Sequence, residues 1–233
     1  MPPPLPSSLA EPWIPGSPLV YRGLLNAYDR ASIFAAARDC FQSGWGTVRR
    51  RSVGMPEKQH LTTPIQTHLR LTRHFREMAP TAWARLRDAT AHADEVLGTK
   101  LSASSAITSA TMKRAASPEV ATPTLEGAFK QADFLHYSGA GKDWVGWHDH
   151  AGESELFIVA LLADEFEGGS FMYRNALSNE EVALDLALGD AVVCPSPMEH
   201  CVRPLASGLR VSLNIDFWSV AQQADTRSAA NKY

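Results

Sequence analysis

The chain of 233 residues is 45% hydrophobic and 20% charged, a composition typical of one soluble globular domain. Its formal net charge of −3 gives no overall positive field, so nucleic acid is not indicated as a partner. No apolar run reaches the roughly 18–20 residues that span a membrane. Cys40, Cys194 and Cys201 lack the close spacing of a disulfide framework, which favours a reducing compartment and a cytoplasmic location.

The N-terminal part of the chain is predicted to be helical after a proline-rich start. Residues 1–18 contain seven prolines and are expected to form an extended arm. Apolar residues at helical spacing then predict helices over 24–41 and 80–97. Thr81 is a candidate cap for the second helix, and Gly98 is expected to end it.

The chain changes character near residue 132. From there it consists of short apolar or alternating runs separated by Gly, Pro, Asn and Asp turn signals. Strands are predicted over 132–137, 155–162, 169–173, 182–186, 191–194 and 209–217, and an earlier one over 45–53. So many short strands are typical of a sandwich or small barrel. We therefore predict a mainly β fold with N-terminal helices (α+β), in which residues 19–233 form a single domain. Helical support is expected over about 19–100 and the β core over about 101–220.

The segment Trp147-His148-Asp149-His150 carries the strongest chemical signal. Residues two apart on a strand face the same way, so His148 and His150 can both point inward. A strand end or bulge can instead turn Asp149 toward a metal. His200, which follows a predicted strand and a turn, is the best candidate for a distant third ligand. Three ligands on one face leave coordination positions open, whereas a structural zinc site needs four.

Several segments in order resemble those of a known family. They are Tyr137-Ser138-Gly139, Trp144-Val145-Gly146-Trp147-His148, the strand 156–162, Phe166-Glu167-Gly168-Gly169-Ser170-Phe171, Gly189-Asp190-Ala191-Val192-Val193, His200 and Gly208-Leu209-Arg210-Val211-Ser212-Leu213. Each segment is weak alone, but together and with fitting gaps they resemble the iron(II)/2-oxoglutarate-dependent oxygenases, particularly the prolyl 4-hydroxylase-like branch. The resemblance covers roughly residues 134–218.

The resemblance implies a fold, a reaction and cofactors. The fold would be a double-stranded β-helix, also called a jelly-roll, and residues 19–233 would form one oxygenase domain. The reaction would couple oxidative decarboxylation of 2-oxoglutarate to hydroxylation, or a related C–H oxidation, of a small organic substrate. Fe(II) and 2-oxoglutarate would be the cofactors, with ascorbate as a candidate reductant. No catalytic residue is expected beyond the metal centre itself.

The resemblance also assigns roles to single residues. His148 and His200 match two iron ligands of the family. Arg210 matches the basic residue that pairs with the distal carboxylate of 2-oxoglutarate, a contact that suits a planar guanidinium. Ser212, on the same strand face, can donate its hydroxyl to that carboxylate. Tyr137 matches a tyrosine that borders the cosubstrate.

The chain departs from the family at one position. The family motif is His-any-Asp or His-any-Glu, and an ungapped match places His150 where the carboxylate belongs. Three interpretations follow. His148, His150 and His200 form a three-histidine centre; Asp149 is the ligand and His150 lines the substrate pocket; or the site is degenerate and catalysis is lost.

Substrate identity is less constrained. Trp147, Tyr173 and Arg174 are candidate substrate-lining residues, with a small molecule as the first expectation and a protein side chain as the second. Two other classes of protein also fit a histidine-rich barrel. One is a three-histidine dioxygenase of the cupin type that needs no 2-oxoglutarate, and the other is a catalytically inactive barrel used for binding.

Overall fold

The computed structural model describes residues 9–42, 48–50, 67–71, 74–99, 101, 128–138 and 144–218. Its helices are α1 (Ala27–Gln42), α2 (His74–Met78) and α3 (Pro80–Leu97). Its strands are β1 (Leu19–Tyr21), β2 (Val48–Arg50), β3 (Thr67–Arg70), β4 (Phe129–Ser138), β5 (Val145–His148), β6 (Leu156–Gly168), β7 (Phe171–Arg174), β8 (Glu181–Leu184), β9 (Ala191–Pro195), β10 (His200–Val202) and β11 (Leu205–Phe217).

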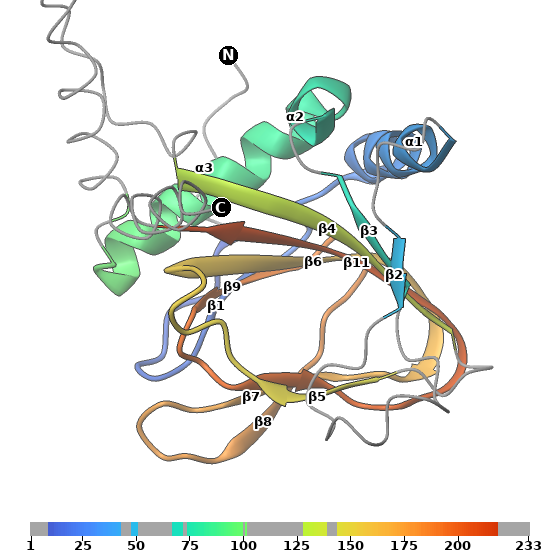
Figure 1. Ribbon diagram of the computed structural model, residues 1–233. Helices are drawn as coiled ribbons and strands as arrows, with labels where there is room; N and C mark the ends of the chain where they lie inside the picture. The colour runs from blue at the N-terminus through green and yellow to red at the C-terminus, as the bar shows by residue number, and fades with distance from the viewer. Residues whose placement is uncertain are drawn as a thin grey trace, which may run out of the picture.

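These strands form two antiparallel sheets. The larger sheet has the order β1-β9-β6-β11-β4-β3-β2, and the smaller sheet has the order β5-β10-β7-β8. The two sheets face each other, and the three helices cover the outer face of the larger sheet (Figure 1). The predicted mainly β fold with N-terminal helices is thus confirmed.

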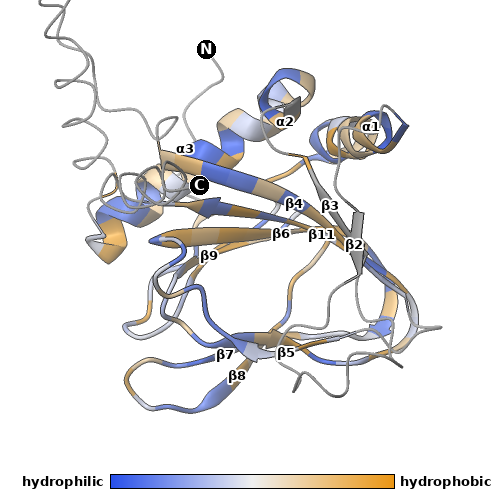
Figure 2. Cartoon of the chain, in the orientation of Figure 1, coloured by the Kyte–Doolittle hydropathy of each residue, from blue (hydrophilic) through white to orange (hydrophobic). Residues whose placement is uncertain are grey.

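The larger sheet separates two hydrophobic clusters. One lies between this sheet and the helices, and the other lies between the two sheets. Strand β6 serves both clusters, because Ile158 and Ala160 belong to the first and Phe157 and Val159 to the second. Figure 2 shows how strongly hydrophobic colouring dominates β6 and β9, which lie inside the larger sheet. A strand buried on both faces needs apolar residues at consecutive positions.

Strand β11 alternates more sharply than β6. Its residues Val211, Leu213, Ile215 and Phe217 belong to the cluster under the helices. The residues between them line a cavity between the sheets, and they are all polar: Arg210, Ser212, Asn214 and Asp216. The side-chain period of two in a strand places these four on one face. The barrel interior along β11 is therefore hydrophilic.

Helix α3 matches its predicted bounds of 80–97, but its predicted cap is wrong. Ala79 holds the N-cap position without a side-chain cap hydrogen bond, and Pro80 occupies the first turn. Proline suits that position because it has no N–H to satisfy and a preset φ, so Thr81 is already inside the helix. Gly98 ends the helix as expected, with φ 68° and its N–H donating to the Asp94 carbonyl at 2.9 Å.

The N-terminal segments contribute more to the sheets than their composition suggested. Strands β1, β2 and β3 all join the larger sheet, although they lie within the part predicted as helical support. Of the strand predicted over 45–53, the described residues are β2; the others lie outside the described part of the chain.

The described part of the proline-rich arm is held against the body. The Glu11 N–H donates to the Val20 carbonyl at 2.9 Å, and Leu9 and Ala10 pack on the cluster under the helices. Further along, the Ser17 hydroxyl accepts hydrogen bonds from Tyr173 at 2.9 Å and from the Asn175 amide at 3.2 Å. The arm therefore contacts both the larger sheet and the smaller one.

Within the described residues, none of the helices has the length and hydropathy needed to cross a bilayer.

At the turn between β6 and β7, the backbone of Gly168 lies close to that of Pro204, and this close approach can be tested. Gly168 has φ 76°, and a Cβ there would lie 2.6 Å from the Pro204 carbonyl oxygen, whereas a Cβ at Gly98 meets nothing within 4 Å. We expect Gly98→Ala to lower the free energy of unfolding by the left-handed backbone penalty of about 1–2 kcal/mol. Gly168→Ala adds the steric contact and should cost clearly more. Urea denaturation of both variants measures the difference, and equal losses would contradict the close backbone approach.

Candidate metal centre

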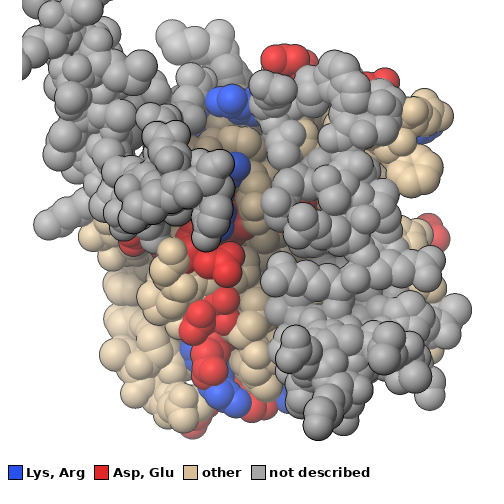
Figure 3. All heavy atoms as spheres, in the orientation of Figure 1, with Lys and Arg blue, Asp and Glu red and all other residues tan. Residues whose placement is uncertain are grey.

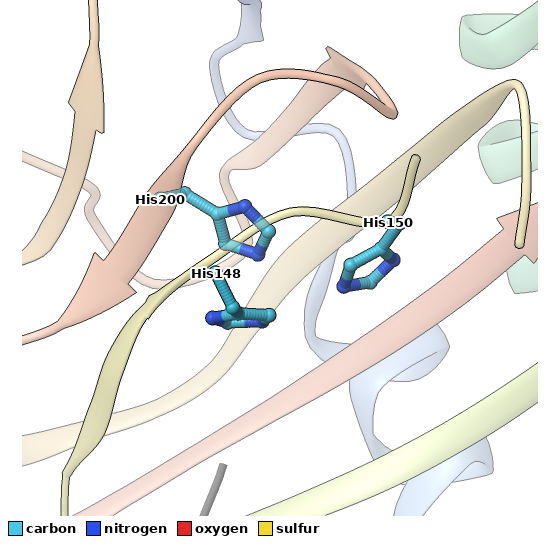
Figure 4. A group of neighbouring side chains, drawn as sticks. All are labelled: His148, His150 and His200. Carbon is cyan, nitrogen blue, oxygen red and sulfur yellow. The ribbon is translucent and has the colours of Figure 1, made fainter. Parts of the chain in front are cut away.

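Three histidines from two neighbouring strands meet between the sheets. His148 ends β5, His150 follows two residues later, and His200 begins β10. Antiparallel pairing of β5 with β10 places His200 directly opposite His148, although the two residues are about fifty positions apart in the sequence. One ligand atom from each ring lies within 4.8 Å of the others. Figure 4 shows the three rings pointing toward a common space.

Hydrogen bonds fix which nitrogen of each ring faces that space. In every case Nδ1 contacts an oxygen that can only accept: the Gly146 carbonyl for His148 at 2.8 Å, the Met198 carbonyl for His200 at 3.1 Å and the Asp216 carboxylate for His150 at 2.8 Å. Nδ1 must therefore carry the hydrogen, and in a neutral ring Nε2 keeps its lone pair. This is the tautomer that a metal-binding histidine needs.

Burial keeps two of the rings in that neutral form. The pKa of His200 lies well below its usual value, first because the ring is desolvated and then because His148 and His150 lie nearby. Burial also lowers the pKa of His148, although its hydrogen bond to Gly146 opposes the shift. Both rings are therefore unprotonated at neutral pH and available as ligands.

Asp149 and His150 lie in different surroundings. Asp149 is exposed, and its carboxylate accepts a hydrogen bond from the Ala151 N–H at 3.0 Å. The His150 ring turns inward and packs on Phe157 with 4.5 Å between ring centroids. The backbone holds this orientation, because the His150 N–H donates to the Ser196 carbonyl at 2.8 Å. The structure thus brings His150 to His148 and His200, while Asp149 lies at the rim of the cavity.

A carboxylate that the sequence interpretation missed lies behind His150. Asp216 is 2% exposed, and besides His150 it accepts a hydrogen bond from the Gln131 amide at 2.7 Å. The same amide nitrogen donates to Asp133 at 3.0 Å. The alternation of polar and apolar residues after Arg210 was a signal for Asp216, since it places this residue on the face of Arg210 and Ser212.

Arg210 lies in the same cavity, which has a volume of about 340 Å³. Its side chain is 1% exposed; it donates a hydrogen bond to the Ser212 hydroxyl at 3.1 Å and lies 5.2 Å from the Tyr137 ring centre. Burial lowers the pKa of Arg210, with Tyr137 opposing the shift, but a guanidinium stays protonated. No carboxylate in the described part of the chain forms an ion pair with it. A buried cation without a counter-ion is costly, so this position is suited to an anionic ligand.

The three predicted substrate-lining residues do not line this cavity. Trp147 precedes the inward-facing His148 on β5, so its side chain points to the opposite face of the strand. There the guanidinium carbon of Arg174 lies 4.5 Å from the centroid of the Trp147 ring. Arg174 also forms an ion pair with Glu199 at 2.6 Å. Tyr173 is buried between the sheets, and its hydroxyl bonds Ser17. Nearness in sequence to the histidines does not fix which way a strand residue faces, and the substrate-lining role of these three residues stays a prediction.

Comparison with known proteins supports the sequence interpretation. No protein-family model matches the chain. A PKHD-type hydroxylase of Synechococcus sp. (strain CC9902) is 30% identical over 76 residues, which cover 30% of this chain and 33% of that protein. The chain thus matches about one third of the length of this relative.

Two solved structures match over most of their length. A 2OG-Fe(II) oxygenase family oxidoreductase from Burkholderia pseudomallei has a TM-score of 0.56 and 15% identity, covering 85% of this chain and 84% of the other. A prolyl-4-hydroxylase of Pseudomonas putida has a TM-score of 0.55 and 15% identity, with 86% and 91% covered. The chain therefore has the double-stranded β-helix fold of the 2-oxoglutarate and iron(II) oxygenases, and its predicted resemblance to their prolyl 4-hydroxylase-like branch is confirmed.

Proposed function

We propose that this protein is a non-haem iron oxygenase that couples oxidative decarboxylation of 2-oxoglutarate to hydroxylation, or a related C–H oxidation, of an organic substrate. One observation carries the proposal. One ligand nitrogen from each of three histidines lies within 4.8 Å of the others, in the same cavity as a buried guanidinium that forms no ion pair with a carboxylate among the described residues. A metal site and an anion site side by side are what a chelating keto acid with a second carboxylate requires.

The residues present fit Fe(II). His148, His150 and His200 would hold the metal through Nε2 and leave other coordination positions open. When bound, the iron supplies dioxygen activation and the oxidising chemistry. Three neutral imidazoles leave the full charge of +2 on the metal, but the Asp216 carboxylate adds negative charge one hydrogen bond away through His150. In place of the family's carboxylate ligand, this protein would have the Asp216 carboxylate hydrogen-bonded to the ligand His150.

The other end of the cavity fits 2-oxoglutarate. Arg210 would pair with the distal carboxylate, where two parallel N–H donors give direction as well as charge. The Ser212 hydroxyl already accepts from Arg210 and can turn its own hydrogen toward the same carboxylate. Tyr137 borders this region from the paired strand β4, directly opposite Arg210.

Arg210 also bears on the alternatives. A three-histidine dioxygenase of the cupin type has no cosubstrate to neutralise this cation, so its substrate would have to do so. An inactive binding barrel has no need for three histidines in the same tautomer. We favour a small organic molecule as the substrate, with a protein side chain second, because the cavity has a volume of only about 340 Å³. The three buried, unpaired cysteines support the proposed cytoplasmic location.

Arg210→Met tests the anchoring of the cosubstrate. Methionine fills a similar space without charge, so the apo-protein should keep or gain thermal stability, since a buried unpaired cation is removed. Affinity for 2-oxoglutarate should fall at least about 30-fold, as expected for a loss of about 2 kcal/mol when a buried charge pair loses one partner. Anaerobic addition of Fe(II) and then 2-oxoglutarate, followed by the weak visible charge-transfer band of a chelated keto acid, measures that affinity. Unchanged affinity would remove Arg210 from the cosubstrate site.

The choice between His150 and Asp149 is tested by replacing each with alanine. We expect His150→Ala to abolish stoichiometric Fe(II) binding, because it removes one of three converging ligand atoms. Asp149→Ala should bind iron normally, because that carboxylate is exposed and engaged in its own turn. Anaerobic equilibrium dialysis with metal analysis gives the stoichiometry. The reverse pattern would make Asp149 the ligand.

Asp216→Asn tests the charge behind His150. The asparagine oxygen can still accept the His150 hydrogen bond, so the ring should keep its orientation while the negative charge is lost. We expect a 10- to 100-fold loss of metal affinity, which is typical when an outer partner of a ligand is changed. Competition against a chromogenic chelator measures it. Asp149→Asn makes the same charge change at the rim and should have little effect; equal losses in both would show a general field rather than a specific contact.

A further inference from the structure

The strands that carry two of the proposed metal ligands pair over a short and irregular stretch. Strand β5 has four residues, β10 has three, and β5 lies at the edge of the smaller sheet. The register shifts between the pair His200 and His148 and the pair Val202 and Val145. So few backbone contacts leave the separation of the two histidines weakly fixed, and support from side chains is to be expected.

The outer face of the smaller sheet, behind these histidines, carries the side chains of the residues that precede them. His148 and His200 line the cavity, whereas Trp147 and Glu199 do not. Neighbouring residues of an extended chain point to opposite faces, so Trp147 and Glu199 lie on the outside. The Glu199 side chain is 44% exposed, which agrees with this orientation.

Arg174 joins these two residues to each other. It ends β7, next to Tyr173, which pairs with His200. Its guanidinium carbon lies 4.5 Å from the Trp147 ring centroid, and its Nη1 donates to Glu199 Oε2 at 2.6 Å. The Arg174 backbone N–H also donates to the Glu199 carbonyl at 2.9 Å. One residue of β7 thus contacts the neighbour of each histidine.

A further ion pair links Arg174 to the edge strand β8. Its Nη2 lies 3.4 Å from Glu181 Oε1, and Glu181 Oε2 accepts a hydrogen bond from Arg203 at 2.9 Å. In Figure 3, basic and acidic side chains lie side by side at the lower end of the described surface, where Figure 1 places β7 and β8. A single exposed ion pair stabilises little, but several charges in one network hold a side chain more firmly.

The contacts of Arg174 require an arginine. A planar guanidinium can stack its face on an indole while its edge N–H groups donate to carboxylates. The ammonium group of lysine is a compact point charge on a flexible chain and cannot make both contacts in this fixed geometry. Shape as well as charge is therefore used at this position.

We propose that Arg174 is a positioning residue of the metal centre. By holding Trp147 and Glu199 together on the outer face, it fixes the separation and orientation of His148 and His200 inside the cavity. This inference rests on the metal centre of the proposed function and does not depend on the cosubstrate or the substrate.

Arg174→Met tests the proposal, with Arg203→Met as the matched control. Both variants remove one exposed positive charge that pairs with Glu181, but among the described contacts only Arg174 reaches Trp147 and Glu199. Outer partners that bond a ligand directly are worth roughly 10- to 100-fold in metal affinity, and Arg174 acts one residue further away. We therefore expect Arg174→Met to bind Co(II) about three- to tenfold more weakly than Arg203→Met, by anaerobic competition with a chelator.

The visible spectrum of bound Co(II) separates positioning from general stability. Its ligand-field bands report the arrangement of the ligands, so they should shift in Arg174→Met and stay as in the parent in Arg203→Met. Thermal unfolding of both apo-proteins should be alike, because both changes are at the surface. Equal affinities and equal spectra in the two variants would overturn the proposal.

Two further variants test the geometry. Arg174→Lys keeps the charge but loses the stacked arrangement, so it should resemble Arg174→Met; parent affinity and spectrum would leave charge alone as the cause and overturn the proposal. Trp147→Leu changes no charge and should also weaken Co(II) binding. Combined with Arg174→Met, it should cost clearly less than the sum of the two single losses, because both remove the same contact. Full additivity would show that Arg174 does not act through Trp147.

The parent and His200→Ala separate this inference from the proposed function. If the parent binds no Co(II), or His200→Ala binds it as tightly as the parent, the three-histidine centre is wrong and both proposals fail. If the parent binds Co(II) through His200 and Arg174→Met behaves as Arg203→Met, only the positioning role of Arg174 is wrong.

Discussion

Strand β11 lies between β6 and β4 in the larger sheet, and its two faces meet opposite surroundings. One face is packed against the helices through the apolar side chains of alternate residues, while the other presents four polar side chains to the interior. A shift of one residue in the register of this strand would exchange the two sets, placing Arg210 under the helices and Val211 in the cavity. The cluster beneath α3 therefore does more than stabilise the fold. It fixes the register that gives the cavity its chemistry.

The interior that results is expensive to maintain. A folded domain is only marginally stable, and a buried guanidinium without a counter-ion, two buried carboxylates and an unsatisfied amide oxygen all oppose folding. Hydrogen bonds from His150 and Gln131 offset the desolvation of Asp216. Among the described residues, Arg210 has no counter-ion and Asn214 Oδ1 has no hydrogen-bond donor. Polar groups of this kind persist where a ligand satisfies them. The parts of the barrel that are least favourable for stability are thus the parts that indicate binding.

Much of this arrangement follows from local sequence patterns. The spacing of apolar residues predicts α3 and most of the strands, because amphipathic periods reflect burial directly. The order of His148, His200 and Arg210 predicts the site, because the fold brings the carrying strands together. Strand β10 is only three residues long, however, and its pairing with β5 depends on the whole barrel.

Other features need three-dimensional context. Whether Asp149 or His150 faces inward depends on a backbone hydrogen bond to Ser196, which no motif records. Asn214 and Asp216 were overlooked because polar residues on an alternating strand ordinarily face solvent. Here the alternation was informative, but its polar face is enclosed by the second sheet.

The hydrogen bond between Ser17 and Tyr173 has a consequence for how this chain can be shortened. Tyr173 pairs directly with His200 across β7 and β10, so the arm braces the strand that carries a metal-binding histidine. Composition alone predicts only that residues 1–18 form an extended arm. A chain that starts at residue 19 would nevertheless leave the buried Tyr173 hydroxyl without its acceptor, on the strand next to the edge of the smaller sheet. Removing the terminus, by design or by a protease, would therefore disturb the strand next to His200. The functional unit includes part of the proline-rich arm.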